Sequence, residues 1–136
     1  LPRHHVRLME RRFKKLDLLD GAHYEIENAD ADAIIMPWGS SKGPAREAYD
    51  RLRADGVDIG WLYSVALNPL PEEVLSVLNS RKKVIVPELN YLGQWSALLR
   101  QDGINAESIT QYTGLPFRPA DLVDSIGQRI GVGVTA

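Results

Sequence analysis

Continuous apolar runs recur along this chain and constrain its fold more than any other feature. Three such runs lie within the strand candidates at residues 33–38, 57–67 and 83–87, the second of which is centred on Ile59-Gly60-Trp61-Leu62-Tyr63. A run without polar alternation is typical of a strand buried on both faces of a sheet. Each run precedes a helix pattern, and these patterns cover residues 44–55, 72–79 and 93–101. Strands that alternate with helices through short connections predict a parallel, doubly wound α/β sheet.

Weaker patterns extend this arrangement at both ends. Residues 24–27 alternate in polarity and predict a short strand, and residues 108–111 predict another. The last helix is expected over residues 119–130, and the glycine-rich residues 131–136 are expected to be loose.

Size and charge exclude several classes of protein. The chain has 136 residues, 44% of them hydrophobic, which suits one domain with its own core. Its net charge of -2 does not fit a globally basic nucleic-acid binder. No apolar run approaches the roughly 18 to 20 residues of a membrane span, and no signal peptide is visible, so a cytoplasmic protein is expected. The chain begins with Leu1, which suggests a processed product or an excised piece of a longer polypeptide.

Cysteine is absent from the sequence. The chain therefore supplies no disulfide, thiol nucleophile, cysteine-held zinc or cysteine-ligated iron-sulfur cluster. The three histidines, His4, His5 and His23, lack a suitably spaced third ligand, so no metal site is predicted.

The opening segment differs in charge from the rest. Residues 1–16 hold six Lys and Arg against Glu10 alone, a balance of +5, so the remaining 120 residues carry -7. Apolar residues at helical spacing predict an amphipathic helix over residues 1–20, ahead of one domain over residues 21–136. Its basic face is expected to be solvated or to meet acidic residues across an interface.

Function is expected in the loops at the carboxyl ends of the strands. The loop after the first run begins at Trp38 and holds Ser40, Ser41 and Lys42 between two glycines. It could bind an anion at a helix start, although it matches neither nucleotide-binding glycine motif. Alternatively, the glycines only allow the turn while a serine caps the helix.

The loop after the third run places Glu88, Asn90 and Gln94 ahead of a helix. These side chains either satisfy backbone groups of the turn and helix or contact a ligand or partner, and both interpretations stay open. Trp38, Trp61 and Trp95 are interpreted as core or interface anchors. No catalytic triad, metal cluster or paired acid and base follows from the spacing.

These loops also carry a family resemblance. The motifs are Ile34-Ile35-Met36-Pro37-Trp38-Gly39-Ser40-Ser41-Lys42-Gly43, Asn68-Pro69-Leu70-Pro71, Val84-Ile85-Val86-Pro87-Glu88-Leu89-Asn90-Tyr91-Leu92-Gly93-Gln94 and Gly114-Leu115-Pro116-Phe117. In this order they resemble the C-terminal domain of the alpha subunit of 2-oxoacid:ferredoxin oxidoreductases, particularly the 2-oxoglutarate type. The opening helix, with His5, Met9, Arg12 and Lys15, resembles the helix that leads into that domain.

The resemblance implies a transketolase C-terminal-like fold. This is a three-layer α/β/α sandwich with a five-stranded, mostly parallel sheet of order 1-3-2-4-5, whose first strand is antiparallel. In that order the second and fourth strands are neighbours, so their following loops should meet at one edge. We therefore expect a crevice or interface cluster, whose members are Trp38, Ser40, Ser41, Lys42, Glu88, Asn90 and Gln94.

The resemblance also implies a function for the whole enzyme. Such enzymes oxidatively decarboxylate a 2-oxoacid to an acyl-CoA, using coenzyme A, thiamine diphosphate with Mg, iron-sulfur clusters, and ferredoxin as electron acceptor. The implied cofactor sites lie in other domains and on the beta subunit. This chain is thus expected to be an inactive assembly domain without catalytic, cofactor-binding or metal-binding residues. It would contact the beta subunit and other alpha-subunit domains, and would be able to form a homodimer when isolated.

Two other interpretations remain. The chain is a self-contained anion- or phosphate-binding α/β module, or it is the related C-terminal domain of a transketolase or of a 2-oxoacid dehydrogenase beta chain. The fold is the same in the second case.

Overall fold

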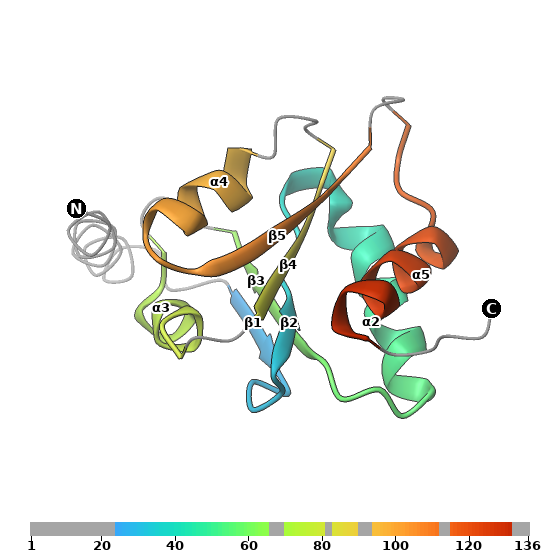
Figure 1. The fold of residues 1–136 in the computed structure, drawn as a ribbon, viewed down its shortest axis with the longest axis horizontal. Coiled ribbons are helices and arrows are strands. Elements are labelled where there is room, and N and C mark those ends of the chain that lie inside the picture. The colour runs from blue at the N-terminus through green and yellow to red at the C-terminus, as the bar shows by residue number, and fades with distance from the viewer. Residues whose placement is uncertain (1–23, 66–69, 81–82, 90–93, 112–114, 132–136) are drawn as a thin grey trace.

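Five strands form a single sheet in the computed structural model, which describes residues 24–65, 70–80, 83–89, 94–111 and 115–131 (Figure 1). The strands are β1 (Tyr24–Glu27), β2 (Ala33–Ile35), β3 (Gly60–Ser64), β4 (Lys83–Glu88) and β5 (Asn105–Thr110). Their order is β1-β3-β2-β4-β5, with β1 antiparallel to β3 and the other pairs parallel. The predicted fold class and strand order are thereby confirmed. The helix expected over residues 1–20 and the tail lie outside the described residues.

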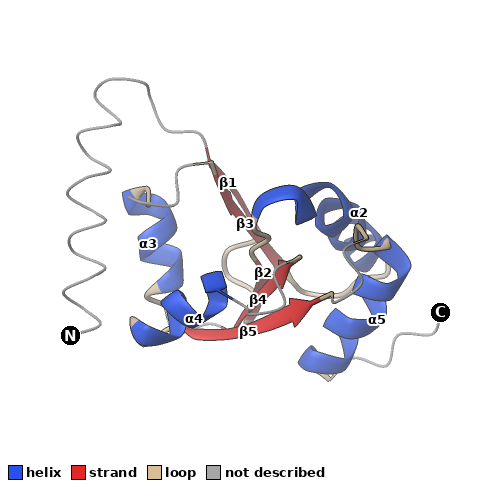
Figure 2. Cartoon of the chain, turned by 90° about the horizontal axis from the view of Figure 1, so that it is seen from above, coloured by secondary structure: helices blue, strands red, loops and turns tan. Residues whose placement is uncertain are grey.

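Helices cover both faces of this sheet (Figure 2). They are η1 (Gly39–Ser41), α2 (Lys42–Ala54), α3 (Glu72–Leu78), α4 (Gln94–Gln101) and α5 (Pro119–Ile130). Figure 2 places α3 and α4 on one side and α2 and α5 on the other, which is the expected three-layer arrangement. Within the described ranges, no helix is long and apolar enough to cross a membrane.

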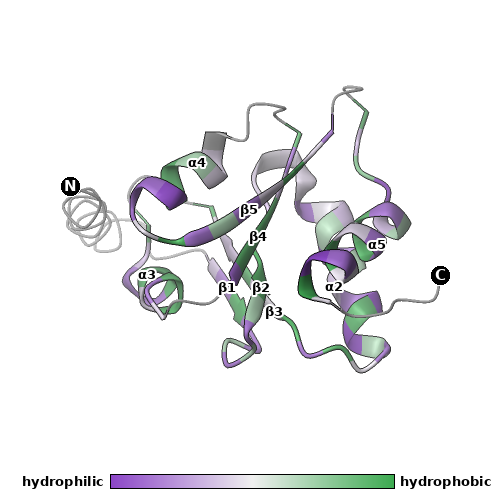
Figure 3. Cartoon of the chain, in the orientation of Figure 1, coloured by the Kyte–Doolittle hydropathy of each residue, from purple (hydrophilic) through white to green (hydrophobic). Residues whose placement is uncertain are grey.

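The two central strands are buried on both faces, as their apolar runs predict. Ile34, Val84 and Val86 belong to the core cluster under α3 and α4. Ile35 and Ile85 belong to the cluster under α2 and α5. Neighbouring residues of a strand point to opposite faces, so one apolar run contributes to two cores. Figure 3 shows β2 and β4 coloured as hydrophobic along most of their length.

Some element boundaries differ from the expected ones. The strand expected over residues 33–38 ends at Ile35, although the Met36 and Trp38 amides still donate to the Ile85 and Pro87 carbonyls. The strand expected over residues 57–67 is shorter, since β3 spans only Gly60–Ser64. The strand expected over residues 108–111 begins earlier, at Asn105, because it pairs with β4 along six residues.

Arginine side chains cover the outer edge of β5. The backbone carbonyls of Ile85 and Pro87 point toward β2, since they accept hydrogen bonds from the chain that follows it. The backbone groups of the residues between them, such as Val86, therefore point toward β5. By the same alternation, the backbone carbonyls of Ala106 and Ser108 point away from β4, toward the outer edge of β5. Arg100 donates to the Ala106 carbonyl at 3.1 Å, and Arg129 lies 3.5 Å from the Ser108 carbonyl. Charged side chains at such a position discourage a further strand from pairing there.

Candidate functional site

The loops after β2 and β4 meet at the carboxyl edge of the sheet through Ser41. The Ser41 Oγ lies 2.6 Å from the Trp38 carbonyl and 2.5 Å from the Pro87 carbonyl, and it accepts the Trp38 amide at 3.2 Å. Its single hydroxyl proton serves one of the two carbonyls at a time. Ser41 is 1% exposed, so this hydroxyl joins two strand ends and faces no solvent.

Glu88 is fully buried and points toward the start of α4. Its carboxylate accepts the backbone amides of Trp95 at 2.8 Å and Ser96 at 3.3 Å, and the Ser108 hydroxyl at 3.0 Å. The first amides of a helix have no partner within the helix, and their partial positive charge favours an anion. Glu88 therefore caps α4 from a neighbouring strand, and these three donors satisfy its charge.

Lys42 lies on the other face of the sheet from Glu88. Its Nζ is 2.8 Å from Glu25 Oε2 and 4.2 Å from the centre of the Tyr63 ring. Glu25 also accepts the Trp61 indole N–H at 2.9 Å. The hydrogen bond from Lys42, followed by the one from Trp61, lowers the pKa of the Glu25 carboxyl, against the opposing effect of burial. The positive charge of Lys42, considered above for anion binding, is thus paired with the Glu25 carboxylate within the domain.

The tryptophans occupy the places expected of anchors. Trp61 and Trp95 are buried in opposite core clusters, while Trp38 is partly buried. The Trp38 and Trp95 rings pack with their centres 5.2 Å apart and tilted by 31°. The buried Trp95 Nε1 has no hydrogen-bond acceptor among the residues that the structure describes. This pair closes the core beneath the loop that follows β2.

The remaining members of the predicted cluster contribute no described contact. Ser40 is exposed at the surface of η1. Asn90 and the side chain of Gln94 lie outside the described residues. The structure thus joins the two loops through Ser41 and Pro87, separates Lys42 from Glu88, and leaves the cluster as a binding site a prediction.

The ionic contacts between β1 and α2 were missed by reasoning from the sequence. Besides the Glu25–Lys42 pair, Arg46 forms a double hydrogen bond with Glu27, and one of its two contacts measures 3.1 Å. The hydrogen bond that Arg46 donates to Glu27 raises the pKa of Arg46, with burial acting against it. Two acids that are two residues apart on a strand, and two bases that are four residues apart on a helix, are a recognisable pattern in a sequence. This pattern identifies the pairing partners only when the strand order is known.

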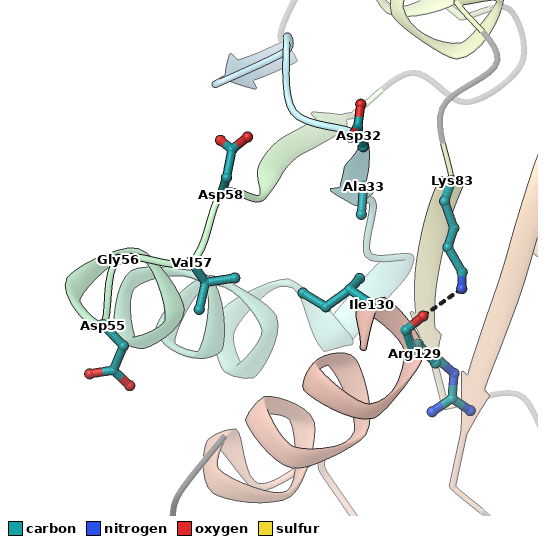
Figure 4. Close-up of a pocket in the computed structure, with 9 residues that line it drawn as sticks. All are labelled: Asp32, Ala33, Asp55, Gly56, Val57, Asp58, Lys83, Arg129 and Ile130. Atoms are coloured by element: carbon teal, nitrogen blue, oxygen red, sulfur yellow. Dashed lines mark hydrogen bonds between the residues drawn. The ribbon is translucent and has the colours of Figure 1, made fainter. Parts of the chain in front are cut away.

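A separate pocket of about 590 Å³ opens at the amino edge of the sheet (Figure 4). It is lined by Asp32, Ala33, Asp55, Gly56, Val57, Asp58, Lys83, Arg129 and Ile130. Lys83 donates to the Arg129 carbonyl at 2.5 Å and pairs with Glu107 at 3.3 Å. Figure 4 shows the Asp55 and Asp58 carboxylates turned away from these two cations. None of the predicted site residues lines this pocket.

Metal binding finds no support in the described ranges. They contain no group of three or more His, Cys, Asp or Glu side chains placed to hold an ion. The whole sequence lacks cysteine, so it offers no thiolate to an iron-sulfur cluster.

Comparison with known proteins gives consistent matches. Residues 31–129 match the family described as pyruvate:ferredoxin oxidoreductase core domain II. The 2-oxoacid:ferredoxin oxidoreductase 1 subunit alpha of Aeropyrum pernix is 35% identical over 130 residues, covering 88% of this chain and 20% of that protein. The 2-oxoglutarate oxidoreductase subunit KorA of Mycobacterium tuberculosis is 34% identical over 132 residues, covering 95% of this chain and 19% of that protein.

A solved structure is also similar. The 2-oxoglutarate:ferredoxin oxidoreductase from Magnetococcus marinus, with 2-oxoglutarate, coenzyme A and succinyl-CoA bound, superimposes with a TM-score of 0.74 at 35% identity. The match covers 93% of this chain and 23% of that one. The chain spans about one fifth of the length of the curated relatives that it matches.

Proposed function

We propose that this chain, which belongs to the family of pyruvate:ferredoxin oxidoreductase core domain II, serves as a non-catalytic domain in the alpha subunit of a 2-oxoacid:ferredoxin oxidoreductase. The 2-oxoglutarate type is favoured, because relatives carrying that substrate in their names match over 93% and 95% of the chain. The role is assembly: the domain supports the parts of the enzyme that hold substrate and cofactors.

One observation carries the non-catalytic part of this proposal. Three polar side chains at the carboxyl edge, those of Ser41, Lys42 and Glu88, are engaged by partners inside the domain. Glu88 is 0% exposed and bound to three donors, Ser41 bridges two strand ends, and Lys42 is paired with Glu25. A group that already satisfies its neighbours is poorly placed to bind a substrate, because binding would first have to break those contacts.

The proposal extends to the complete enzyme. Its reaction would be the oxidative decarboxylation of a 2-oxoacid to an acyl-CoA, with thiamine diphosphate, Mg and iron-sulfur clusters bound elsewhere in the assembly. The residues of this chain do not fit the clusters, since cysteine is absent. The beta subunit and ferredoxin enter the proposal from the family resemblance alone, and a cytoplasmic location enters it from the sequence pattern.

Calorimetry on the 136-residue chain tests this division of labour. Titration with Mg²⁺ and thiamine diphosphate, with coenzyme A and with 2-oxoglutarate should give no saturable heat. Adding the chain to an alpha subunit that lacks this domain, together with the beta subunit, should restore 2-oxoglutarate-dependent reduction of ferredoxin. Saturable binding of any of the three ligands to the chain alone would contradict the proposal.

The same material distinguishes the anion-binding interpretation. A true ligand at 100 times its dissociation constant stabilises a protein by about 2.7 kcal/mol. Inorganic phosphate and nucleotides should leave the unfolding temperature of the chain unchanged. A phosphate-dependent shift that Lys42→Ala abolishes would favour the binding module instead.

A further inference from the structure

The two edges of the sheet are held in different ways. At one edge β5 pairs with β4 along six residues and buries Ala106 and Ile109. At the other edge β1 pairs with β3 along four residues, and none of the four is fully buried. Among the described strands, only β3 lies beside β1 in the sheet. The strand β1 is therefore held by a single ladder of backbone hydrogen bonds.

Charged contacts hold β1 to the helix below it. Glu25 and Glu27 lie on the same face of β1 and meet Lys42 and Arg46, which lie one helical turn apart on α2. Two residues along a strand span about 6.6 Å, and four residues along a helix rise about 6 Å. The two acids and the two bases therefore match in spacing, and both ion pairs form at once.

Both cations keep other contacts that do not involve β1. Lys42 lies over the Tyr63 ring of β3, and Arg46 lies 5.1 Å from the Tyr49 ring centre and 5.2 Å from that of Trp61. Arg46 also lies 3.3 Å from Asp50. If β1 departs, these cations stay over their rings, and β3 stays paired with β2. The four other strands therefore keep backbone pairing with one another that does not involve β1, although β3 pairs with β2 at only two residues.

We propose that β1 is an edge strand latched by the Glu25–Lys42 and Glu27–Arg46 ion pairs, and that it opens as a unit while the other four strands stay folded. Ile26 packs against one core cluster and favours the closed state. The ion pairs set how often the strand opens, and opening uncovers the hydrogen-bonding edge of β3. The paired side chains of Lys42 and Glu25 are 38% and 40% exposed, so salt reaches and weakens this latch.

Native-state amide exchange on the whole 136-residue chain tests the latch. The amides of β1, and those of β3 that pair with it, should exchange through a local opening, well before Val84 and Val86 of β4. Raising the ionic strength from about 0.01 M to about 1 M, which shortens the Debye length from about 30 Å to about 3 Å, should increase exchange at β1 and leave β4 unchanged.

Charge-removing variants give the second readout. Lys42→Met or Arg46→Met should raise the opening constant of β1 about threefold, and the double variant about tenfold. Arg51→Met is the matched control, because Arg51 pairs with Glu47 within the same helix and contacts no strand in the described chain.

Three results would overturn the latch. β1 could exchange at the same rate as β4, which would mean that it opens only on global unfolding. Exchange at β1 could be independent of salt in the wild-type chain, a measurement that does not depend on the folding of any variant. Finally, Arg51→Met could accelerate β1 as much as Arg46→Met does, which would assign the effect to the helix as a whole.

Discussion

Replacing Glu88 by alanine should destabilise the domain more than any surface substitution. The variant leaves the buried amides of Trp95 and Ser96 without an acceptor, and the Ser108 hydroxyl loses its partner. A buried donor without a partner costs about 1–3 kcal/mol, and a lost helix cap costs about 1 kcal/mol. The serine hydroxyl can rotate to another acceptor, so the two amides dominate.

The expected loss is about 3 kcal/mol in the free energy of unfolding, taking the lower part of each range because the contacts share one carboxylate. For a domain of this size it corresponds to a decrease of about 12 °C in the unfolding temperature. Glu88→Gln should lose about half as much, because the amide keeps one acceptor oxygen. Urea unfolding followed by tryptophan fluorescence measures both values.

Glu73→Ala is the matched control, since Glu73 is an exposed glutamate in the first turn of α3. It should change the free energy of unfolding by less than about 0.5 kcal/mol. A loss below about 1 kcal/mol for Glu88→Ala, or equal losses for the alanine and glutamine variants, would refute the capping role of the carboxylate.

Two further predictions concern the first half of the chain. The folded pKa of Glu25 lies below its ordinary value of 4.5 because of Lys42, so the unfolded chain binds the proton more readily. The stabilising contribution of Glu25 is therefore complete above pH 4.5 and is lost as the pH falls through the folded pKa. Glu25→Gln should flatten this part of the profile of urea stability against pH. An unchanged slope would contradict the prediction. Gly60→Ala should cost about 1–3 kcal/mol in thermal unfolding, since the added Cβ would lie 2.7 Å from the Asn28 carbonyl oxygen. Gly43→Ala, whose Cβ meets nothing within 4 Å in α2, should be neutral or stabilising, and equal effects at both glycines would refute the steric reasoning.

The central part of the fold could be predicted because its local signals agree with its tertiary environment. The apolar residues of β2 and β4 are buried on both faces, as the runs require. The last helix begins at Pro119 and ends before Gly131, which adopts a left-handed conformation with φ of 73°. These terminal residues are the ones that helix geometry favours, so both boundaries were predicted correctly.

The edges of the sheet and the contacts of the site were harder to predict. β5 mixes polar and apolar residues, since Asn105 and Glu107 reach solvent while Ala106 and Ile109 are buried, and its first half carried no clear pattern. The sequence offers Lys42 as a cation for an anion in only one of two interpretations of its loop, and it does not indicate the acid that pairs with it. Its partner Glu25 is 17 residues away, and only the antiparallel placement of β1 beside β3 brings them together.

The arginines that cover β5 also limit how copies of this domain could polymerise. A sheet grows into a fibre only when both of its edges accept a new strand, because each added copy must offer an edge to the next. Here Arg100 and Arg129 occupy carbonyls along one edge. Among the described strands, pairing through the sheet is then favoured on the β1 side, and a second copy added there uses the β1 edge of both partners. Such an association closes at two copies and cannot propagate.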